Sequence, residues 1–359
     1  MKEGFINNGG AIIQSMIDEG VKNGSRNATV TGNYIIEKTI KIPSNFSLYL
    51  QDCHLVMADD TFCNMFTNER CWTEEGLTAN GKDENIVIEG RGRVILDGGN
   101  YNGLSERNSL KDGMPSIYRN NLVLFVNVEH FKVTGIHARN QRWWAFDFIF
   151  CAYGTIRDID FLADGTRIDE NGNRVKGLYW GQPGGHPAIY IRNADGIDIR
   201  RGCHDILIEN ITGFTEDDTV ALTCLPSKMH QVEGKSEDMY NVMIRNVRAC
   251  SHCAIVRLLC QGGAKQYNIL IDGVMDASKE CDCLSGPGET GVRIGDNEMY
   301  GSRHATEEEC YNIHVKNVYA RTLQVLWLAG NIGNITYENI NGFDQPENAP
   351  IIRDDRMNK

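Results

Sequence analysis

DILIENITGF, residues 205–214, is the stretch of this chain that decides its fold. It begins with an acidic residue, alternates aliphatic and polar residues, and then has Asn followed by another aliphatic residue. Alternation with a period of two predicts a β-strand, and Asn marks a bend where a positive φ is tolerated. Four later segments have the same pattern: NVMIRNVRAC (241–250), NILIDGVMDA (268–277), NIHVKNVYAR (312–321) and NITYENINGF (334–343).

These five segments form a repeat. Their starts are separated by 36, 27, 44 and 22 residues, and NIVIEGRGRV (85–94) and HFKVTGIHAR (130–139) look like earlier copies. Short strands that recur without helices between them indicate a solenoid. We therefore predict an all-β fold, a right-handed parallel β-helix, in which identical side chains of successive coils form ladders about 4.8 Å apart. Four asparagines at the bends predict one such ladder, bonded to backbone groups: Asn210, Asn246, Asn317 and Asn339.

The end of a β-helix exposes strand edges and needs a cap. GGAIIQSMIDEGVKNG (9–24) has apolar residues at helical spacing and ends in Asn-Gly, which predicts an amphipathic helix covering the N-terminal end of the core. No Pro/Ser-rich linker divides the chain. We therefore predict one domain over residues 1–359, with the cap and first coils in about 1–60 and the repeat coils in about 85–340.

Composition narrows the class of function. The 359 residues are 41% hydrophobic and 23% charged, the net charge is −12, and no stretch of eighteen apolar residues occurs. An acidic chain without basic runs is a poor partner for nucleic acid, and nothing predicts a membrane segment or a cofactor. The start MKEGFINNGG lacks the apolar core of a signal peptide, so we expect a cytoplasmic protein, or a secreted one whose leader has been removed.

The chain has twelve cysteines, too irregularly spaced to predict a disulfide framework. Cys250, Cys253, Cys260, Cys281 and Cys283 leave a zinc site open as an alternative. However, the first three lie in and beside the apolar stretch ACSHCAIVRLLC, where cysteine packs as a small hydrophobic residue. The number of free thiols favours a reducing compartment.

TGFTEDDTVALTC (212–224) places Glu216, Asp217 and Asp218 directly before an apolar strand. Asp195 lies 22 residues before Asp217, which is one bare repeat, so we expect the two backbones to be stacked neighbours with both carboxylates on the outer face. Neighbouring carboxylates with separated pKa values suit cleavage of a glycosidic bond, in which one protonates the leaving oxygen and another activates water. Calcium binding by the clustered carboxylates is a second possibility.

The order of motifs resembles glycoside hydrolase family 28, the polygalacturonase family. The matching residues are Asn193–Ile199, Asp217-Asp218 followed by an apolar strand, His252, and Arg293-Ile294, with GRGRVILDGGN (90–100) upstream. The resemblance covers about residues 85–340 and implies a right-handed β-helix and an inverting hydrolysis. It implies Asp217 as the general acid, Asp195 and Asp218 as the residues that position and activate water, His252 as support for the acids, and Arg293 as a substrate ligand.

The chain departs from the family pattern at three places. Asn193-Ala194-Asp195 replaces Asn-Thr-Asp, which is a mild change. Ser251-His252-Cys253 replaces Gly-His-Gly, and Gly295 replaces the lysine that the family uses to hold a galacturonate carboxylate. Plain polygalacturonate is therefore a poor candidate substrate. Glu216 has no counterpart in the family motif and is interpreted as a solvated turn residue. Further candidates for substrate binding are Trp180 and His186 in the loop GLYWGQPGGHPAIY (177–190), Asn193, and Arg257.

Two other functions fit the same fold. A uronic-acid lyase or epimerase needs a base beside the C5 proton and a cation to stabilise the carbanion. A β-helix that binds carbohydrate without cleaving it needs no catalytic carboxylate at all.

Overall fold

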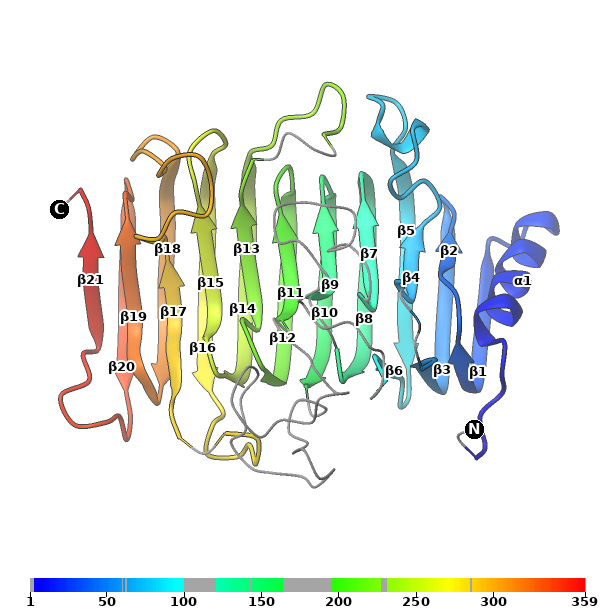
Figure 1. Cartoon of the computed structure of the whole chain (residues 1–359), viewed down its shortest axis with the longest axis horizontal. Coiled ribbons are helices and arrows are strands. Elements are labelled where there is room, and N and C mark those ends of the chain that lie inside the picture. Colours follow the sequence, from blue (N-terminus) through cyan, green and yellow to red (C-terminus); the bar gives the residue numbers. More distant parts are fainter. Residues whose placement is uncertain are drawn as a thin grey trace.

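The computed structural model describes residues 3–59, 61, 63–99, 121–141, 144–163, 195–226, 231–284 and 286–358. Within these residues, strands from successive coils stack side by side in two parallel sheets, which we call sheet A and sheet B (Figure 1). Sheet A contains β1 (Asn27–Ile36), β3 (Phe46–Met57), β5 (Asp83–Arg91), β6 (Ile95–Asp97), β8 (Val128–Arg139), β10 (Ala152–Leu162), β12 (His204–Thr215), β14 (Met239–Ser251), β16 (Gln266–Asp276), β18 (Cys310–Ala320) and β20 (Ile335–Gly342).

Apart from β6, which follows β5 in sheet A, the described strands alternate between sheet A and sheet B along the chain. The one other described element besides the N-terminal helix is a 3-10 turn at Glu75–Leu77. Sheet B contains β2 (Ile40–Ile42), β4 (Phe66–Asn68), β7 (Val123–Val126), β9 (Trp144–Ile149), β11 (Asp195–Arg200), β13 (Val220–Cys224), β15 (Ala254–Cys260), β17 (Gly288–Ile294), β19 (Thr322–Gly330) and β21 (Ile352–Arg356).

The predicted repeat is confirmed strand by strand. The five segments that define it are β12, β14, β16, β18 and β20, and the two earlier copies are β5 and β8. The register of sheet A reproduces the spacing read from the sequence, because Ile206 pairs with Val242, Val242 with Ile269, Ile269 with Ile313, and Ile313 with Ile335. The fold is the predicted right-handed parallel β-helix.

The core is built from aliphatic ladders inside the coils. Ile208, Ile244, Ile271 and Val315 are neighbours in consecutive strands of sheet A, and none of them is exposed. Each buried aliphatic side chain of this size contributes about 1.5–3 kcal/mol of transfer free energy. Residues at alternate positions point out of the coil, so any chemistry must lie on the outer faces or in the turns.

The asparagine ladder is present, but it is bonded differently from the prediction. All four asparagines have a positive φ. Asn246 donates a hydrogen bond to the side chain of Asn210 at 3.3 Å, and Asn339 donates to Asn317 at 3.0 Å. Gly273, also with a positive φ, takes the asparagine position in the coil between them, and Asp272 just before it accepts from Asn317 at 2.8 Å. The amides therefore bond one another along the stack, because each bend repeats at the spacing of the coils.

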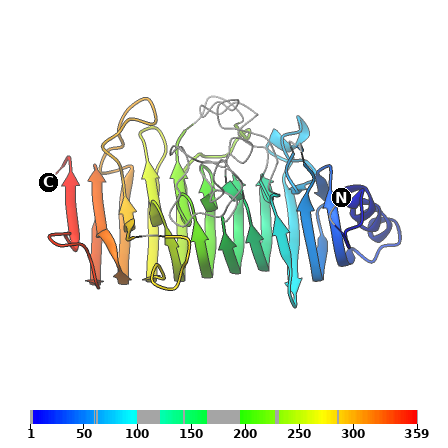
Figure 2. The ribbon, with the colours of Figure 1, turned by 60° about the horizontal axis from the view of Figure 1, so that its bottom comes forward.

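The predicted cap is α1 (Gly9–Lys22), which lies at the N-terminal end of the stack in Figure 1 and Figure 2. Ile13 and Ile17 belong to the core cluster and are fully buried. Their spacing of four residues places both on one face of the helix, which covers the first coil. Of the described helices, none has the length and apolarity needed to cross a membrane.

Candidate active site

The acidic residues gather where β11 and β13 begin. These strands pair with Ile197 beside Val220, and the backbone N–H of Gly196 donates to the carbonyl of Asp218 at 2.9 Å. Followed back to the first residue of β11, this register places Asp195 beside Asp218.

The expectation that Asp195 would stack on Asp217 is therefore wrong by one residue. Ile197 and Val220 are both fully buried, and they are 23 residues apart. An offset of 22 residues would place Ile197 beside Thr219 and turn Val220 out of the core, because a slip by one residue reverses the face of every side chain. Asp217 lies one position before this pair, in the turn that follows β12.

Backbone and hydroxyl contacts fix the turn that carries Asp217 and Asp218. The Asp217 carbonyl accepts hydrogen bonds from the Thr215 hydroxyl at 2.7 Å and from the Ser251 hydroxyl at 2.5 Å. The Asp218 carboxylate accepts from the backbone N–H of Ala254 at 3.0 Å. Ser251 and Ala254 belong to the next coil, so the two aspartates are held by the coil that follows them.

The same crowding of carboxylates shifts their acidity. Burial raises the pKa of Asp195 well above its usual range, and the negative charges of Asp198, Asp217 and Asp218 add to the effect. Burial, followed by the charge of Asp217, raises the pKa of Asp218 to about 7, against the opposing attraction of Arg257. The site therefore keeps protons at neutral pH that exposed aspartates would lose.

His252 lies beside this turn, as the sequence predicts. Its Nε2 is 3.6 Å from Oε2 of Glu216, and its ring meets the edge of Phe214 with centroids 5.7 Å apart. Glu216 itself is fully buried. Its interpretation as a solvated turn residue is wrong, because β12 runs on through Thr215 and carries the next residue under His252 rather than out to solvent. The family motif has no position that would have indicated this contact.

A row of outward-facing residues continues the site along sheet B. The strand register makes Asp147, Asp198, Ala221, Arg257, Arg293, Trp327 and Arg353 consecutive neighbours. We call these seven residues the outer row. Their neighbours in each strand, such as Ile199 and Leu258, point into the core.

The basic half of the outer row is organised by one buried carboxylate. Oδ2 of Asp296 accepts a hydrogen bond from Arg257 Nη2 at 2.5 Å and from Arg293 Nη2 at 2.7 Å. The Arg293 guanidinium also lies 3.9 Å from the centre of the Trp327 ring, an arrangement typical of cation–π contact. Arg257 and Arg293, which the sequence analysis names as candidate substrate ligands, thus lie together. Asp296 and Trp327 were not predicted, because nothing in the motif marks them.

The other half of the outer row is acidic and buried. Asp147 and Asp198 are paired in register and are 0% and 1% exposed. Burial raises the pKa of Asp147 to about 7, although Arg200 and Arg201 oppose the shift. Asp198 Oδ1 lies 3.5 Å from Arg200 Nη1. The outer row therefore changes from carboxyl groups to guanidiniums across Ala221, which is itself buried.

Three sequence-predicted ligands, Trp180, His186 and Asn193, lie outside the described residues. Among the residues that are described, no three His, Cys, Asp or Glu side chains are arranged to hold a metal ion. The calcium and zinc alternatives find no ligand set in that part of the chain.

Solved structures share this fold at low sequence identity. The chain aligns with a 1,3-α-1,4-β-D-galactose-4-sulfate-3,6-anhydro-D-galactose-2-sulfate 4 galactohydrolase over 96% of its own length and 85% of the other, with a TM-score of 0.58 and 11% identity. It aligns with the iota-carrageenase of family GH82 from A. fortis over 98% and 87%, with a TM-score of 0.57 and 11% identity. It aligns with the A-module of the mannuronan C-5 epimerase AlgE4 from Azotobacter vinelandii over 94% of its own length and 74% of the other, with a TM-score of 0.55 and 12% identity.

No curated protein sequence matches the chain. The model of one protein family, glycosyl hydrolases family 28, matches residues 33–235. This range contains the Asn193–Ile199 motif and Asp217-Asp218, and it ends before His252 and Arg293. More than half of the chain is matched, and the fold agrees with the resemblance read from the sequence. The chain belongs to glycosyl hydrolases family 28.

Proposed function

We propose that this protein hydrolyses a glycosidic bond of a poly- or oligosaccharide with inversion at the anomeric carbon. The observation that carries the proposal is the placement of Asp195 beside Asp218, both with a raised pKa, next to the fixed Asp217. Inverting enzymes of this kind use one carboxylic acid to protonate the leaving oxygen and a carboxylate to activate water. A buried cluster that holds protons at neutral pH can supply both forms.

The roles follow the family motif. Asp217 donates the proton to the leaving oxygen, and Asp195 and Asp218 orient water and accept its proton. His252, backed by buried Glu216, supports the acids from the side of the next coil. The hydroxyl of Ser251 holds the carbonyl of Asp217, so this departure from the family's Gly-His-Gly supplies a positioning contact of its own.

The outer row supports a substrate of uneven charge. Two guanidiniums share the carboxylate of Asp296, and Nη1 of Arg293 also lies 3.9 Å from Oε2 of Glu289, so the site offers several N–H donors to an anionic sugar over β15 and β17. Arg257 thereby supplies, from another strand, the cation that Gly295 lacks. Asp147 and Asp198 on the other side are buried carboxyl groups whose pKa values burial raises, so they suit a neutral sugar there. We propose a bond between a neutral sugar and one that carries a carboxylate or sulfate, rather than plain polygalacturonate.

A panel of defined neutral, uronic-acid and sulfated oligosaccharides tests this proposal. We expect new reducing ends, no product absorbing near the ultraviolet edge, and the inverted anomer in the NMR spectrum of the first product. An ultraviolet-absorbing product would instead identify a lyase, and a C5-inverted sugar without cleavage would identify an epimerase. Binding that persists in Asp217→Asn, with no cleavage of any glycan by the wild type, would identify a non-catalytic carbohydrate-binding protein.

A further inference from the structure

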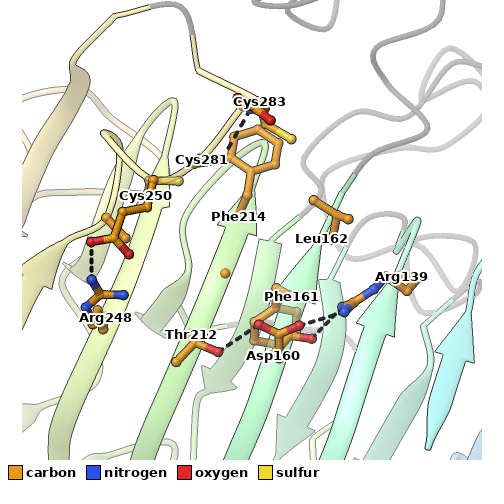
Figure 3. Close-up of a pocket in the computed structure, with 14 residues that line it drawn as sticks. Arg139, Asp160, Phe161, Leu162, Thr212, Phe214, Arg248, Cys250, Cys281 and Cys283 are labelled. Carbon is orange, nitrogen blue, oxygen red and sulfur yellow. Dashed lines mark hydrogen bonds and ion pairs between the residues drawn. The ribbon is translucent and has the colours of Figure 1, made fainter. Parts of the chain in front are cut away.

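A second feature lies on sheet A, behind the turns that carry the candidate acids. A pocket of about 600 Å³ opens at the ends of β10, β12 and β14 (Figure 3). Three thiols line it: Cys250 from the end of β14, and Cys281 and Cys283 from the segment that follows β16. None of the candidate catalytic aspartates lines this pocket.

The three cysteines pack together in one cluster. Cys250 and Cys283 are nearly completely buried and pack against Phe214 and Leu284, whereas Cys281 is half-buried at the pocket. The backbone N–H of Cys283 donates to the sulfur of Cys281 at 3.4 Å, and Cys281 packs against the cluster that contains Cys250 and Cys283. A backbone N–H that donates to a sulfur favours the thiolate over the thiol.

The acidity of these groups agrees with that geometry. The hydrogen bonds from Cys250 and Cys283 lower the pKa of Cys281 to about 3. The same hydrogen bond to Cys281, followed by burial, raises the pKa of Cys250. Thiolates of this kind are the ones that oxidants attack, whereas buried thiols with ordinary surroundings are inert.

Cys250 also connects the pocket to the candidate active site. It is followed directly by Ser251, whose hydroxyl donates to the Asp217 carbonyl at 2.5 Å, and by His252. The floor of the pocket, Phe214, is the residue whose ring meets His252. A covalent change at Cys250 therefore acts on the backbone that holds both residues.

We propose that Cys281 is a peroxide-reactive thiolate and that Cys250 is its resolving thiol, so that oxidation forms a Cys250–Cys281 disulfide beside the candidate active site. In the first step, the Cys281 thiolate attacks a peroxide oxygen, the O–O bond breaks, and hydroxide leaves and takes a proton from solvent. The sulfur is oxidised to a sulfenic acid, and the peroxide is reduced. In the second step, Cys250 attacks that sulfur, the S–S bond forms, and the S–O oxygen leaves as water with the proton of Cys250.

The first experiment needs no substrate. The reduced protein is treated with hydrogen peroxide, blocked with iodoacetamide and digested, and its disulfides are mapped by mass spectrometry. We expect a Cys250–Cys281 peptide in the wild type, and in Cys250→Ser a sulfenic acid at Cys281 that dimedone captures. A Cys281 that stays reduced, or that pairs with a cysteine other than Cys250, would overturn the assignment.

An alkylation rate gives a test that does not depend on any variant folding. At pH 6, iodoacetamide should modify Cys281 at least about 10-fold faster than Cys71, a half-buried thiol whose pKa is raised by burial. Equal rates at the two cysteines would show that Cys281 is not held as a thiolate and would contradict the proposal.

The effect on catalysis rests on the proposed function and is measured separately. Peroxide should lower the turnover of the wild type at least about fivefold, dithiothreitol should restore it, and Cys281→Ser should keep its basal turnover and resist peroxide. Inactivation of Cys281→Ser by peroxide to the same extent would overturn the link between the disulfide and the site. Absence of turnover in every form would refute the proposed function, whereas the mapped disulfide and the alkylation rate would still decide the thiol chemistry.

Discussion

The outer faces of the two sheets differ in how far their side chains repeat from coil to coil. On sheet A the same contact recurs from coil to coil: Tyr240, Tyr267 and Tyr311 stack with centroids 5.1 Å apart, and the asparagine amides bond one another. On sheet B the outer row places unlike groups on neighbouring strands, from Asp198 through Ala221 to Arg257. Repetition on one face stabilises the coil, and the loss of repetition on the other marks the site.

The hydrogen bonding of the two faces differs in the same way. Within the described part of the chain, one buried carboxylate oxygen each of Asp147, Asp195 and Asp198 has no hydrogen-bond partner, and neither does Nε of Arg257 or Arg293. A buried polar group without a partner costs about 1–3 kcal/mol. Such costs persist where a ligand supplies the missing partner. The comparison therefore predicts that substitutions on sheet B change catalysis and that matched substitutions on sheet A do not.

Asp217→Asn should have the largest effect. Removing a general acid that is otherwise well positioned costs about 10²–10⁴-fold in rate, and we expect turnover to fall by about 10³-fold on the best oligosaccharide. The matched control is Asp205→Asn on sheet A, where the carboxylate accepts a hydrogen bond from Asn241 at 2.9 Å. Initial rates of both variants, with melting curves to confirm folding, make the measurement.

Full activity in Asp217→Asn would remove the proposed acid, and an equal loss in Asp205→Asn would remove the distinction between the two faces. If Asp218→Asn loses activity and Asp217→Asn keeps it, Asp218 rather than Asp217 would be the proton donor. That outcome would fit the pKa of about 7 at Asp218 and would leave the site in place.

Arg257→Met should rank second. This change keeps the volume of the side chain, leaves Arg293 to pair with Asp296, and removes one guanidinium from the basic half of the outer row. We expect kcat/KM to fall by about 10²-fold on an acidic oligosaccharide, the size of a lost charge-assisted contact, and by less than about threefold on a neutral one. The control is Arg245→Met on the exposed face of sheet A. Arg245 forms a solvated ion pair with Glu209 at 3.8 Å, and such pairs contribute little.

An equal loss on acidic and neutral substrates would contradict the proposed charge preference. Arg257 would then act by positioning Asp296 or the strand itself. Comparing KM with kcat separates these roles, because a lost ground-state contact to an anion raises KM most.

The difference between the faces also explains what the sequence could predict. The segments of sheet A repeat a pattern of residue types, so their order, their spacing and even their register follow from the printed sequence. Asp195, Asp217 and Asp218 were predicted from the repeat spacing and the family motif, and His252 and Arg293 from the family motif. None of these depends on a distance between residues that are far apart in the chain.

The rest of the site depends on such distances. Asp296 joins Arg257 to Arg293 only after two coils have been stacked, and Asp147 becomes a neighbour of Asp198 through a register that no local pattern gives. Glu216 looks like a turn residue because it precedes two aspartates, yet the course of β12 buries it. These contacts depend on how the strands pair, and the pairing depends on the lengths of the insertions between coils. The offset between β11 and β13 exceeds the expected one by a single residue, which places Asp195 beside Asp218 instead of Asp217.

Asp147→Asn should change stability through pH. The folded-state pKa of about 7 lies above the value of about 3.9 for an exposed aspartate, so the folded state binds the proton more tightly. The stability that this proton contributes is complete below pH 4 and is lost as the pH rises through 7. The amide mimics the protonated form, so at pH 8 the variant should be more stable than the wild type by about 2–4 kcal/mol, with little difference at pH 4.

Denaturant unfolding at the two pH values measures this difference. A difference between wild type and Asp147→Asn that does not grow with pH would mean that Asp147 is ionised in the folded protein.

We expect the smallest effect from a substitution in the asparagine ladder of sheet A. Asn246 has a φ of 52° and donates to Asn210 at 3.3 Å, so Asn246→Ala loses an exposed hydrogen bond and puts a less tolerant residue in the left-handed region. We expect a loss of about 1–2 kcal/mol in the free energy of unfolding and no change in kcat/KM. Asn246→Gly, which relieves the backbone and loses only the amide, should recover part of the stability. If Asn246→Ala instead lowers kcat/KM without lowering the free energy of unfolding, the asparagine ladder affects the candidate site on sheet B. The proposal that sheet A serves stability and sheet B serves catalysis would then be wrong.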